Sequence, residues 1–499
     1  MYKGIVLGIV FLFIGMSFTS ISGNQIDNDN VMESGKNILK PRCRIGINIR
    51  EHVKFDMGNL GKGCDGYILF TPWFSTKSYL LNDWKIVHTW KSQYIPGLSV
   101  YLLENGNLLR SDYAPHPGIV WGSGDTGRVE MFNWDGTQLW NFVYANDTVC
   151  LHHDIEPLPN GNVLMISWEV KTKEEAIEAG CKPSNIPEDT IWVDHIIEVK
   201  PTGPESGDIV WKWHVWDHLI QDHDPLKENY GVVADHPELI DINFMSQGSD
   251  KDWNHINAID YNQEFDHILL TSAGQSEIWV IDHSTTTEEA AGHTGGNSGK
   301  GGDLLYRWGN PQSYHAGDTE DRRFYFHHDA RWIEPGYPGE GHITVFHNGY
   351  WRPGEDYSEV FELKPPVDSY GNYYLEPGSA FGPEEPFWIY SADNPSDFFA
   401  VGQSGAERLP NGNTLICHGP GGFFFEVTPD NKIVWFYSNL LGGAGVFKIN
   451  FYPPDYPGIK SIITPGNKYF NSPILNFLQS RPNLLPLLQK IIQQQDFGL

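Results

Sequence analysis

The amino-acid sequence predicts an all-β protein, a six-bladed β-propeller with a short N-terminal extension and a short C-terminal helical tail. Three observations support this fold: a turn motif that recurs along the chain, a second motif that ends on tryptophan, and the composition. The 499 residues include 52 Gly, 33 Pro and 18 Trp, and 14% of them are aromatic. Many aromatic residues together with many Gly and Pro favour short strands and tight turns over long helices.

The recurring turn motif has the pattern Leu-x-Asn-Gly-Asn-x-Leu and occupies residues 103–109, 158–164 and 409–415. An Asn-Gly pair between two β-rich runs predicts a hairpin, because both residues tolerate a positive φ angle. Residues 259–270 and 333–346 take the same place in the repeat without the Asn-Gly-Asn sequence. Each of these segments therefore predicts a hairpin inside a repeated unit.

A second motif follows each turn and ends on tryptophan, as at Trp140 and Trp435. A unit of four short strands cannot bury both faces alone, so neighbouring units stack and close a ring. We expect six blades, with five or seven as alternatives, and residues 446–452 supply a strand that completes the first blade. The six units are residues 66–95, 96–146, 147–235, 250–315, 324–395 and 400–440.

The two ends of the chain differ from the repeats. Lys3 and the apolar run of residues 4–18 predict a cleaved secretory signal peptide, with an uncleaved membrane anchor as the alternative. The protein is then expected to be secreted, either periplasmic or extracellular. Residues 474–479 and 484–494 predict short helices, and the Gly/Thr/Ser-rich insertion 285–302 predicts a mobile loop. The expected domains are residues 1–23 (signal peptide), 24–65 (N-terminal extension), 66–455 (catalytic propeller) and 456–499 (tail).

Charge and cysteine content limit the partners and the chemistry. With 34 Lys and Arg against 63 Asp and Glu, the formal net charge is -29, which argues against a nucleic-acid partner. Five cysteines in an exported protein allow disulfides, and the candidate local pairs are Cys43 with Cys64 and Cys150 with Cys181. No cysteine pair has the spacing of a structural zinc site.

Histidines recur at equivalent places in the repeat. A slot five positions before the turn motif holds a polar residue in four units: His153, His255, His328 and Ser404. A second slot, at the end of the next strand, holds His347 and His418. Because the first strand of each blade lines the central channel, residues in equivalent slots converge there. The imidazoles either cap strand ends, bind zinc or copper, or act without a metal. The carboxylates have no fixed ligand spacing, so we expect no metal and no cofactor.

Four segments resemble the bacterial arylsulfotransferase family. They are Asp-Trp-Asn-His-Ile-Asn at 252–257, His-Asp-Ala-Arg-Trp-Ile at 328–333, Phe-His-Asn-Gly-Tyr-Trp-Arg at 346–352, and the last-blade segment 404–415. The resemblance extends over roughly residues 60–455. It implies a propeller enzyme that moves a sulfuryl group from a phenolic sulfate ester to a phenolic acceptor through a sulfated histidine. The partners it implies are small phenolic molecules.

The resemblance also implies roles for individual residues. The family's nucleophile lies in the last blade, which makes His418 the expected nucleophile and His255 the alternative. His255 and His328 are then expected to carry protons in acid–base catalysis. The expected substrate-binding residues are His153, Asn348, Arg352, Arg331 and His347. The alternative functions are a non-catalytic or quinone-binding propeller, or a sulfate-ester hydrolase or lyase on the same scaffold.

Overall fold

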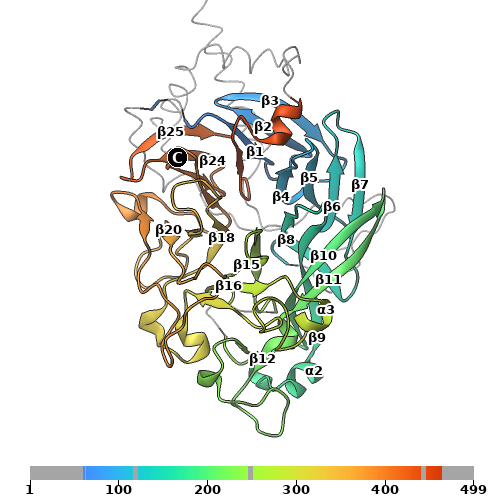
Figure 1. Cartoon of the computed structure of the whole chain (residues 1–499), viewed down its shortest axis with the longest axis vertical. Helices are drawn as coiled ribbons and strands as arrows, with labels where there is room; N and C mark the ends of the chain where they lie inside the picture. The colour runs from blue at the N-terminus through green and yellow to red at the C-terminus, as the bar shows by residue number, and fades with distance from the viewer. Residues whose placement is uncertain (1–59, 62, 116–121, 246–250, 440–444, 463–499) are drawn as a thin grey trace, which may run out of the picture. The chain divides into compact units, whose positions relative to one another are not determined.

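The computed structural model describes residues 60–61, 63–115, 122–245, 251–439 and 445–462. Within them, six antiparallel four-stranded sheets surround a common centre (Figure 1). The prediction of an all-β, six-bladed propeller is therefore confirmed. No helix among the described residues is long and apolar enough to cross a membrane.

Each blade begins with an innermost strand at the centre of the ring and ends with an outermost strand at its rim. In this order, blades one and two consist of β26 (Asn450–Tyr452), β1 (Tyr67–Phe70), β2 (Lys77–Asn82) and β3 (Lys85–Lys91), then β4 (Pro96–Leu102), β5 (Leu108–Tyr113), β6 (Gly127–Phe132) and β7 (Gln138–Val143). Blades three and four consist of β8 (Val149–Pro157), β9 (Val163–Thr172), β10 (Thr190–Gly203) and β11 (Ser206–His214), then β14 (Ile256–Asn262), β15 (His267–Ser272), β16 (Glu277–Asp282) and β17 (Tyr306–Trp308). Blades five and six consist of β18 (His327–Trp332), β19 (Ile343–His347), β20 (Glu359–Leu363) and β21 (Trp388–Tyr390), then β22 (Gly405–Arg408), β23 (Thr414–His418), β24 (Phe423–Val427) and β25 (Ile433–Ser438).

The ring closes where the last strand joins the first blade. β26 pairs antiparallel with β1, so that Tyr452 lies opposite Tyr67 and Asn450 opposite Leu69. This pairing confirms that residues 446–452 supply a strand of the first blade. Closure leaves no open sheet edge at the junction between the two ends of the ring.

The three Asn-Gly turns are hairpins, but of a different type from the one expected. Gly106, Gly161 and Gly412 have φ angles of 83°, 86° and 87°, whereas the Asn before each glycine does not have a positive φ. Each glycine N–H donates to the carbonyl of the Leu three residues earlier. This is a three-residue loop with a type I turn followed by a left-handed glycine. Only the glycine therefore requires the left-handed conformation.

The tryptophans that end the second motif are buried between neighbouring blades. Trp140 packs with Val163, Met165 and Ile197, which belong to β9 and β10 of the next blade. Its indole N–H donates to the carbonyl of Ser206 at 2.9 Å. The repeated tryptophan therefore joins one blade to the next, which explains its recurrence along the chain.

Short elements lie between the strands. They are the parallel pair β12 (Leu219–Ile220) and β13 (Ile240–Asp241), the helices α2 (Lys173–Glu178), α3 (Thr287–Ala290) and α4 (Pro457–Ile462), and the 3-10 helices η1 (Pro183–Asn185), η2 (Val215–His218), η3 (Val233–Asp235), η4 (Pro311–Tyr314), η5 (Thr319–Asp321) and η6 (Pro395–Asp397). The insertion 285–302, expected as a mobile loop, contains α3. The carbonyl of its Gly302 accepts a hydrogen bond of 2.7 Å from the indole of Trp213.

The expected disulfide between Cys150 and Cys181 does not form. Both are buried free thiols. Cys150 packs with Trp168 and Trp192, whereas Cys181 belongs to a separate core cluster and lies beside the carbonyl of Ile242. Cys64 is also a free thiol, and Cys43 lies outside the described residues. The signal peptide, most of the N-terminal extension and the helices expected at 474–479 and 484–494 also lie outside the described residues.

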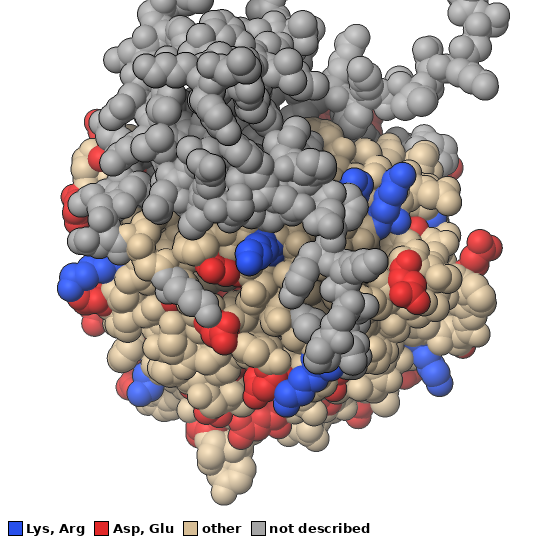
Figure 2. Space-filling model, turned by 90° about the horizontal axis from the view of Figure 1, so that it is seen from above, with Lys and Arg blue, Asp and Glu red and all other residues tan. Residues whose placement is uncertain are grey.

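Charged residues are mixed on the surface. On the described part of the face in Figure 2, Lys and Arg side chains are scattered among Asp and Glu rather than gathered into one basic area. This mixed distribution accompanies the acidic composition of the chain, with 34 Lys and Arg against 63 Asp and Glu.

Candidate active site

The structure brings together three of the predicted histidines at the centre of the ring. His153 belongs to β8, His255 directly precedes β14, and His328 belongs to β18, so each comes from a different blade. The ring centroids of His153 and His255 are 4.7 Å apart. The ring of Phe447 lies 6.1 Å from that of His153 and 6.3 Å from that of His328. We call these three histidines the histidine cluster.

Irregular backbone within the innermost strands, or directly before them, directs these side chains. His153 and His255 have φ angles of 51° and 45°, in the left-handed region that non-glycine residues rarely adopt. The pairing of β8 shifts register between Leu151 and Ile155, and that of β18 shifts between His328 and Arg331. Bulges of this kind turn a side chain out of the regular alternation of a strand. The repeated slot in the sequence is thus a repeated irregularity of the backbone.

His255 is oriented by a carboxylate. Its Nδ1 donates to Oδ2 of Asp252 at 2.5 Å, and the indole of Trp168 donates to the other carboxylate oxygen at 2.8 Å. Burial tends to raise the pKa of Asp252, but the paired imidazole outweighs this and lowers the pKa below its usual value. The side chain of His255 is 16% exposed, whereas His153 and His328 are buried. His255 is therefore the accessible ring of the histidine cluster.

A second chain of hydrogen bonds leads to His153. Nε2 of His152 lies 2.8 Å from Oδ1 of Asp194, and its Nδ1 lies 2.9 Å from Nδ1 of His153. Burial lowers the pKa of His152 to about 3. Burial and the neighbouring imidazoles lower the pKa of His153 well below its usual value. Both rings are therefore neutral at neutral pH. A neutral imidazole has one N–H and one nitrogen with a lone pair, so each ring has one nitrogen that can accept a proton.

Aromatic side chains border the histidine cluster. The ring of Phe326 lies 5.8 Å from that of His255 and 5.1 Å from that of His328. Trp351 lies 6.1 Å from Phe326 and is 40% exposed. An apolar wall that reaches from solvent to the imidazoles suits an aromatic ligand.

His328 and Asn348 bond to each other rather than presenting their polar atoms to a ligand. Nδ1 of His328 donates to Oδ1 of Asn348 at 2.7 Å, and its Nε2 accepts from the backbone N–H of Gln403 at 3.1 Å. The amide of Asn348 donates to the carbonyls of Ala400 and Gln403. Both residues are buried, and burial lowers the pKa of His328 to about 3. The roles of Asn348 in substrate binding and of His328 in proton transfer stay predictions.

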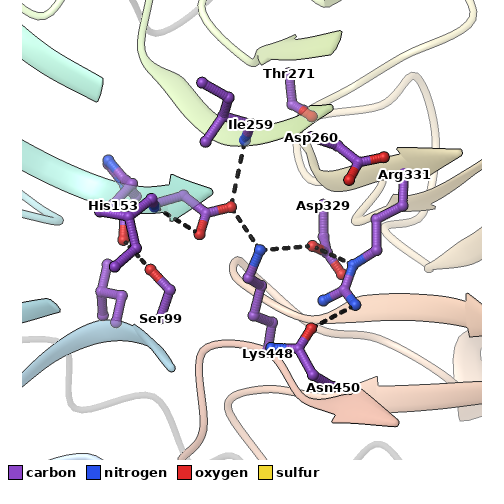
Figure 3. A network of polar contacts seen from close by, with 12 residues as sticks. Ser99, His153, Ile259, Asp260, Thr271, Asp329, Arg331, Lys448 and Asn450 are labelled. Atoms are coloured by element: carbon purple, nitrogen blue, oxygen red, sulfur yellow. Dashed lines mark hydrogen bonds and ion pairs between the residues drawn. The ribbon is translucent and has the colours of Figure 1, made fainter. Parts of the chain in front are cut away.

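Arg331 belongs to a buried ion network (Figure 3). Its guanidinium binds Asp329 at 2.8 Å, Asn450 at 2.8 Å and the carbonyl of Ile449 at 3.0 Å. Lys448 lies between the acidic residues of two blades, 3.4 Å from Asp329 and 2.5 Å from Asp154. Arg331 thus has internal partners, and its contact with substrate stays a prediction.

Arg352 and His347 form a pair within blade five. Arg352 donates to Glu359 at 2.8 Å, and its guanidinium carbon lies 3.5 Å from the ring centroid of Tyr357. Nε2 of the buried His347 accepts from the backbone N–H of Tyr325 at 2.9 Å, and its Nδ1 lies 3.5 Å from Glu359. Their polar groups contact one another, Glu359 and the backbone, and their contact with substrate stays a prediction.

His418, the expected nucleophile, has a hydrogen-bond partner at each ring nitrogen. Its Nε2 donates to the carbonyl of Phe399 at 2.8 Å, and its Nδ1 accepts from the N–H of Gly421 at 3.0 Å. The ring stacks on Phe423 at 4.3 Å and is buried. Both nitrogens therefore have neighbouring partners, and the role of His418 as nucleophile stays a prediction.

Sequence reasoning overlooked three residues of the site. Asp252 stood inside the motif that contains His255, three positions away, but no role was expected for it. His152 is the chain neighbour of His153. Asp194 is 42 positions from His152, and no local pattern connects the two.

Comparisons with known proteins agree with the resemblance seen in the motifs. A family model described as Arylsulfotransferase (ASST) matches residues 116–434. No curated protein matches the chain. Three of the similar solved structures are a protein of unknown function from Bacteroides caccae (13% identity, 78% of this chain and 98% of that chain covered, TM-score 0.43), Kuenenia stuttgartiensis hydrazine synthase (10%, 77% and 81%, 0.37) and the Cps50 (Swd1) β-propeller domain from Myceliophteria thermophila (9%, 81% and 98%, 0.39). Because the family model matches more than half of the 499 residues, the chain belongs to the arylsulfotransferase family.

Proposed function

We propose that this protein transfers a sulfuryl group from an aryl sulfate ester to a phenol, and that His255 is the nucleophile. The observation that carries the proposal is the hydrogen bond between Asp252 and His255 in the accessible ring of the histidine cluster. The carboxylate holds the proton on Nδ1 and leaves the lone pair on Nε2. Membership of the family supports the reaction class.

In the first half-reaction, Nε2 of His255 attacks the sulfur of the ester. The bond from sulfur to the aryl oxygen breaks, and the phenolate leaves with its electron pair. The product is a sulfated imidazolium, whose positive ring charge the Asp252 carboxylate offsets. Phe326 and Trp351 provide the aromatic wall against which the aryl groups of donor and acceptor would stack.

In the second half-reaction, His153 acts as general base. Its lowered pKa keeps the ring neutral, so a ring nitrogen can accept the proton of the acceptor phenol as the bond from the phenol oxygen to sulfur forms. The phenol oxygen attacks the sulfur, the nitrogen–sulfur bond breaks, and its electron pair returns to Nε2 of His255. The proton then passes from His153 to solvent, where it balances the phenolate released in the first half-reaction, and the enzyme is restored.

The test uses para-nitrophenyl sulfate as donor with and without phenol as acceptor. Wild-type protein should form phenyl sulfate, and without acceptor a His255 peptide should gain the mass of one SO₃ group. His255→Ala should lose the adduct. It should also reduce the transfer rate by more than about 10⁴-fold, which is the largest factor that general acid–base catalysis supplies. His236→Ala, at an exposed surface histidine, is the matched control and should behave as wild type.

Three results contradict parts of the proposal. An adduct on another residue would remove His255 from the role of nucleophile. Release of inorganic sulfate without phenyl sulfate would make the protein a sulfate-ester hydrolase. Absence of activity towards every aryl sulfate would favour the alternative of a non-catalytic, ligand-binding propeller.

We further propose that the protein is exported, on the strength of Lys3 and the apolar residues 4–18. The mature N-terminus of the secreted protein, read by mass spectrometry, should lie near residue 24. An intact Met1 would contradict cleavage.

A further inference from the structure

Two histidines and a carboxylate meet in the insertions of blades three and four, away from the histidine cluster. Oδ1 of Asp303 lies 2.9 Å from Nδ1 of His218 and 2.7 Å from Nδ1 of His293. His218 ends η2, and the other two residues flank the Gly-rich loop that follows α3. The potential ligand atoms of all three residues lie within 4.8 Å of one another.

The arrangement of protons at His218 is unusual. Its Nε2 lies 2.8 Å from the carbonyl of Ala290, which can only accept, so Nε2 carries a proton. A neutral imidazole has a single N–H, and Nδ1 then presents a lone pair to the carboxylate oxygen of Asp303. Two lone pairs at 2.9 Å repel each other unless a proton or a metal ion lies between them. A histidine whose far nitrogen donates to a backbone carbonyl is the usual form of a metal ligand.

Burial differs across the three residues in a way that suits a metal site. The side chain of His218 is fully buried, that of Asp303 is 8% exposed, and that of His293 is 60% exposed. The ring of His218 stacks on Trp213 at 5.7 Å, and a Cβ at Gly302 would lie 2.6 Å from its Nε2. His218 is therefore held rigidly, while the side of His293 opens to solvent and leaves room for a water ligand.

A second group of potential ligands fits a metal less well. Glu169, His195 and His214 lie on one face of blade three, with their ligand atoms within the same distance of one another. The ammonium group of Lys171 lies 3.1 Å from Glu169 and already supplies positive charge there. No Lys or Arg forms an ion pair with Asp303 among the residues that the structure describes.

We propose that His218, His293 and Asp303 bind a divalent transition-metal ion, for which zinc is the best fit, and that the ion fastens the 285–303 insertion to the propeller. Two imidazoles and a carboxylate with an open fourth position form a common zinc ligand set, with metal–ligand distances of about 2.0–2.2 Å. The ion takes the place of the protons between the three side chains. Binding joins η2 to the Gly-rich loop, two segments separated by more than 70 positions in the sequence.

The test uses the full chain without an affinity tag, stripped with a chelator and titrated with zinc in a calorimeter. We expect one zinc ion per chain and slower proteolysis within residues 291–302 when zinc is bound. The stripped protein loaded with cobalt should show the visible absorption of a four-coordinate site. His293→Ala is the main variant, because this exposed side chain can be removed without disturbing the core, and it should weaken zinc binding by about 10–100-fold or more.

Two control variants locate the ion. His236→Ala, which removes a surface histidine paired with Glu238, should leave zinc binding unchanged. His214→Ala, in the second group, should also leave it unchanged. Absence of zinc binding in the wild type, or binding that His214→Ala abolishes and His293→Ala leaves intact, would overturn the proposal. Equal losses in His293→Ala and His236→Ala would show surface binding only and would overturn it too.

Discussion

Oδ2 of Asp252 accepts a hydrogen bond of 2.5 Å from Nδ1 of His255, and Oδ1 of the same carboxylate accepts one from the indole of Trp168. The indole also stacks on His152 at 4.0 Å. One tryptophan of β9 thus contacts both chains of polar groups that lead to the histidine cluster. The orientation of His255 depends on the neighbouring blade as well as on its own segment.

Replacing Asp252 with Asn should lower kcat for sulfuryl transfer by about 10²–10⁴-fold. The amide can offer an N–H to Nδ1, which moves the imidazole proton to Nε2 and removes the nucleophilic lone pair. Initial rates with para-nitrophenyl sulfate and phenol measure the effect. Asp235→Asn changes an exposed carboxylate and should keep the wild-type rate. A fully active Asp252→Asn protein would show that the tautomer of His255 does not matter.

Replacing His418 with Ala should reduce stability and leave the covalent step intact. The change leaves the carbonyl of Phe399 and the N–H of Gly421 without their hydrogen bonds, and an unsatisfied buried group costs about 1–3 kcal/mol. Urea denaturation measures the loss, and peptide mass spectrometry should still find the SO₃ adduct on His255. Loss of the adduct from a folded His418→Ala protein would favour His418 over His255 as the nucleophile.

Replacing Lys448 with Met should destabilise the propeller by about 3–5 kcal/mol, the usual result of leaving a buried charge without its partner. Lys448 is buried between Asp154 and Asp329, which belong to the innermost strands of blades three and five. Chemical denaturation measures the free energy of unfolding. Lys460→Met, at an exposed position of α4, should change it by less than about 0.5 kcal/mol. Similar values for the two variants would mean that the ion network does not stabilise the ring.

Stability should depend on pH through His283. Burial alone lowers its pKa, but hydrogen bonds to Asp266 at 2.7 Å and Glu198 at 3.1 Å outweigh burial and raise the pKa to about 9. A raised pKa in the folded state adds stability that is complete below the unfolded value of about 6.5 and is lost as pH rises through about 9. The slope of this loss is at most about 1.4 kcal/mol per pH unit.

Comparison with His283→Gln isolates this contribution. The difference in unfolding free energy between wild type and variant should be largest near pH 6 and should shrink towards pH 9. Denaturation curves at several pH values measure it. A difference that stays constant over this range would show that His283 does not change its protonation on unfolding.

Local chemistry accounts for the parts of the fold that the sequence predicted. Each Asn-Gly hairpin turn needs a glycine in the left-handed conformation, and a blade needs a tryptophan that packs against the next blade. Both residues recur because the blades recur. The slot of His153, His255 and His328 was visible for the same reason. Equivalent positions on innermost strands must meet at the centre of a closed ring.

By itself, the sequence determined the class of fold and the repeated slot that holds the three histidines, and it predicted six blades and the resemblance to the family. Only the tertiary structure decided which polar groups keep an accessible atom. His418 and Arg331 lose theirs to neighbouring groups, and Asp252 gains a role by holding His255. The physical reason is that a buried polar group must find a partner, and the partner often comes from a distant segment. Asp154 and Lys448, 294 positions apart, are joined only when the ring closes.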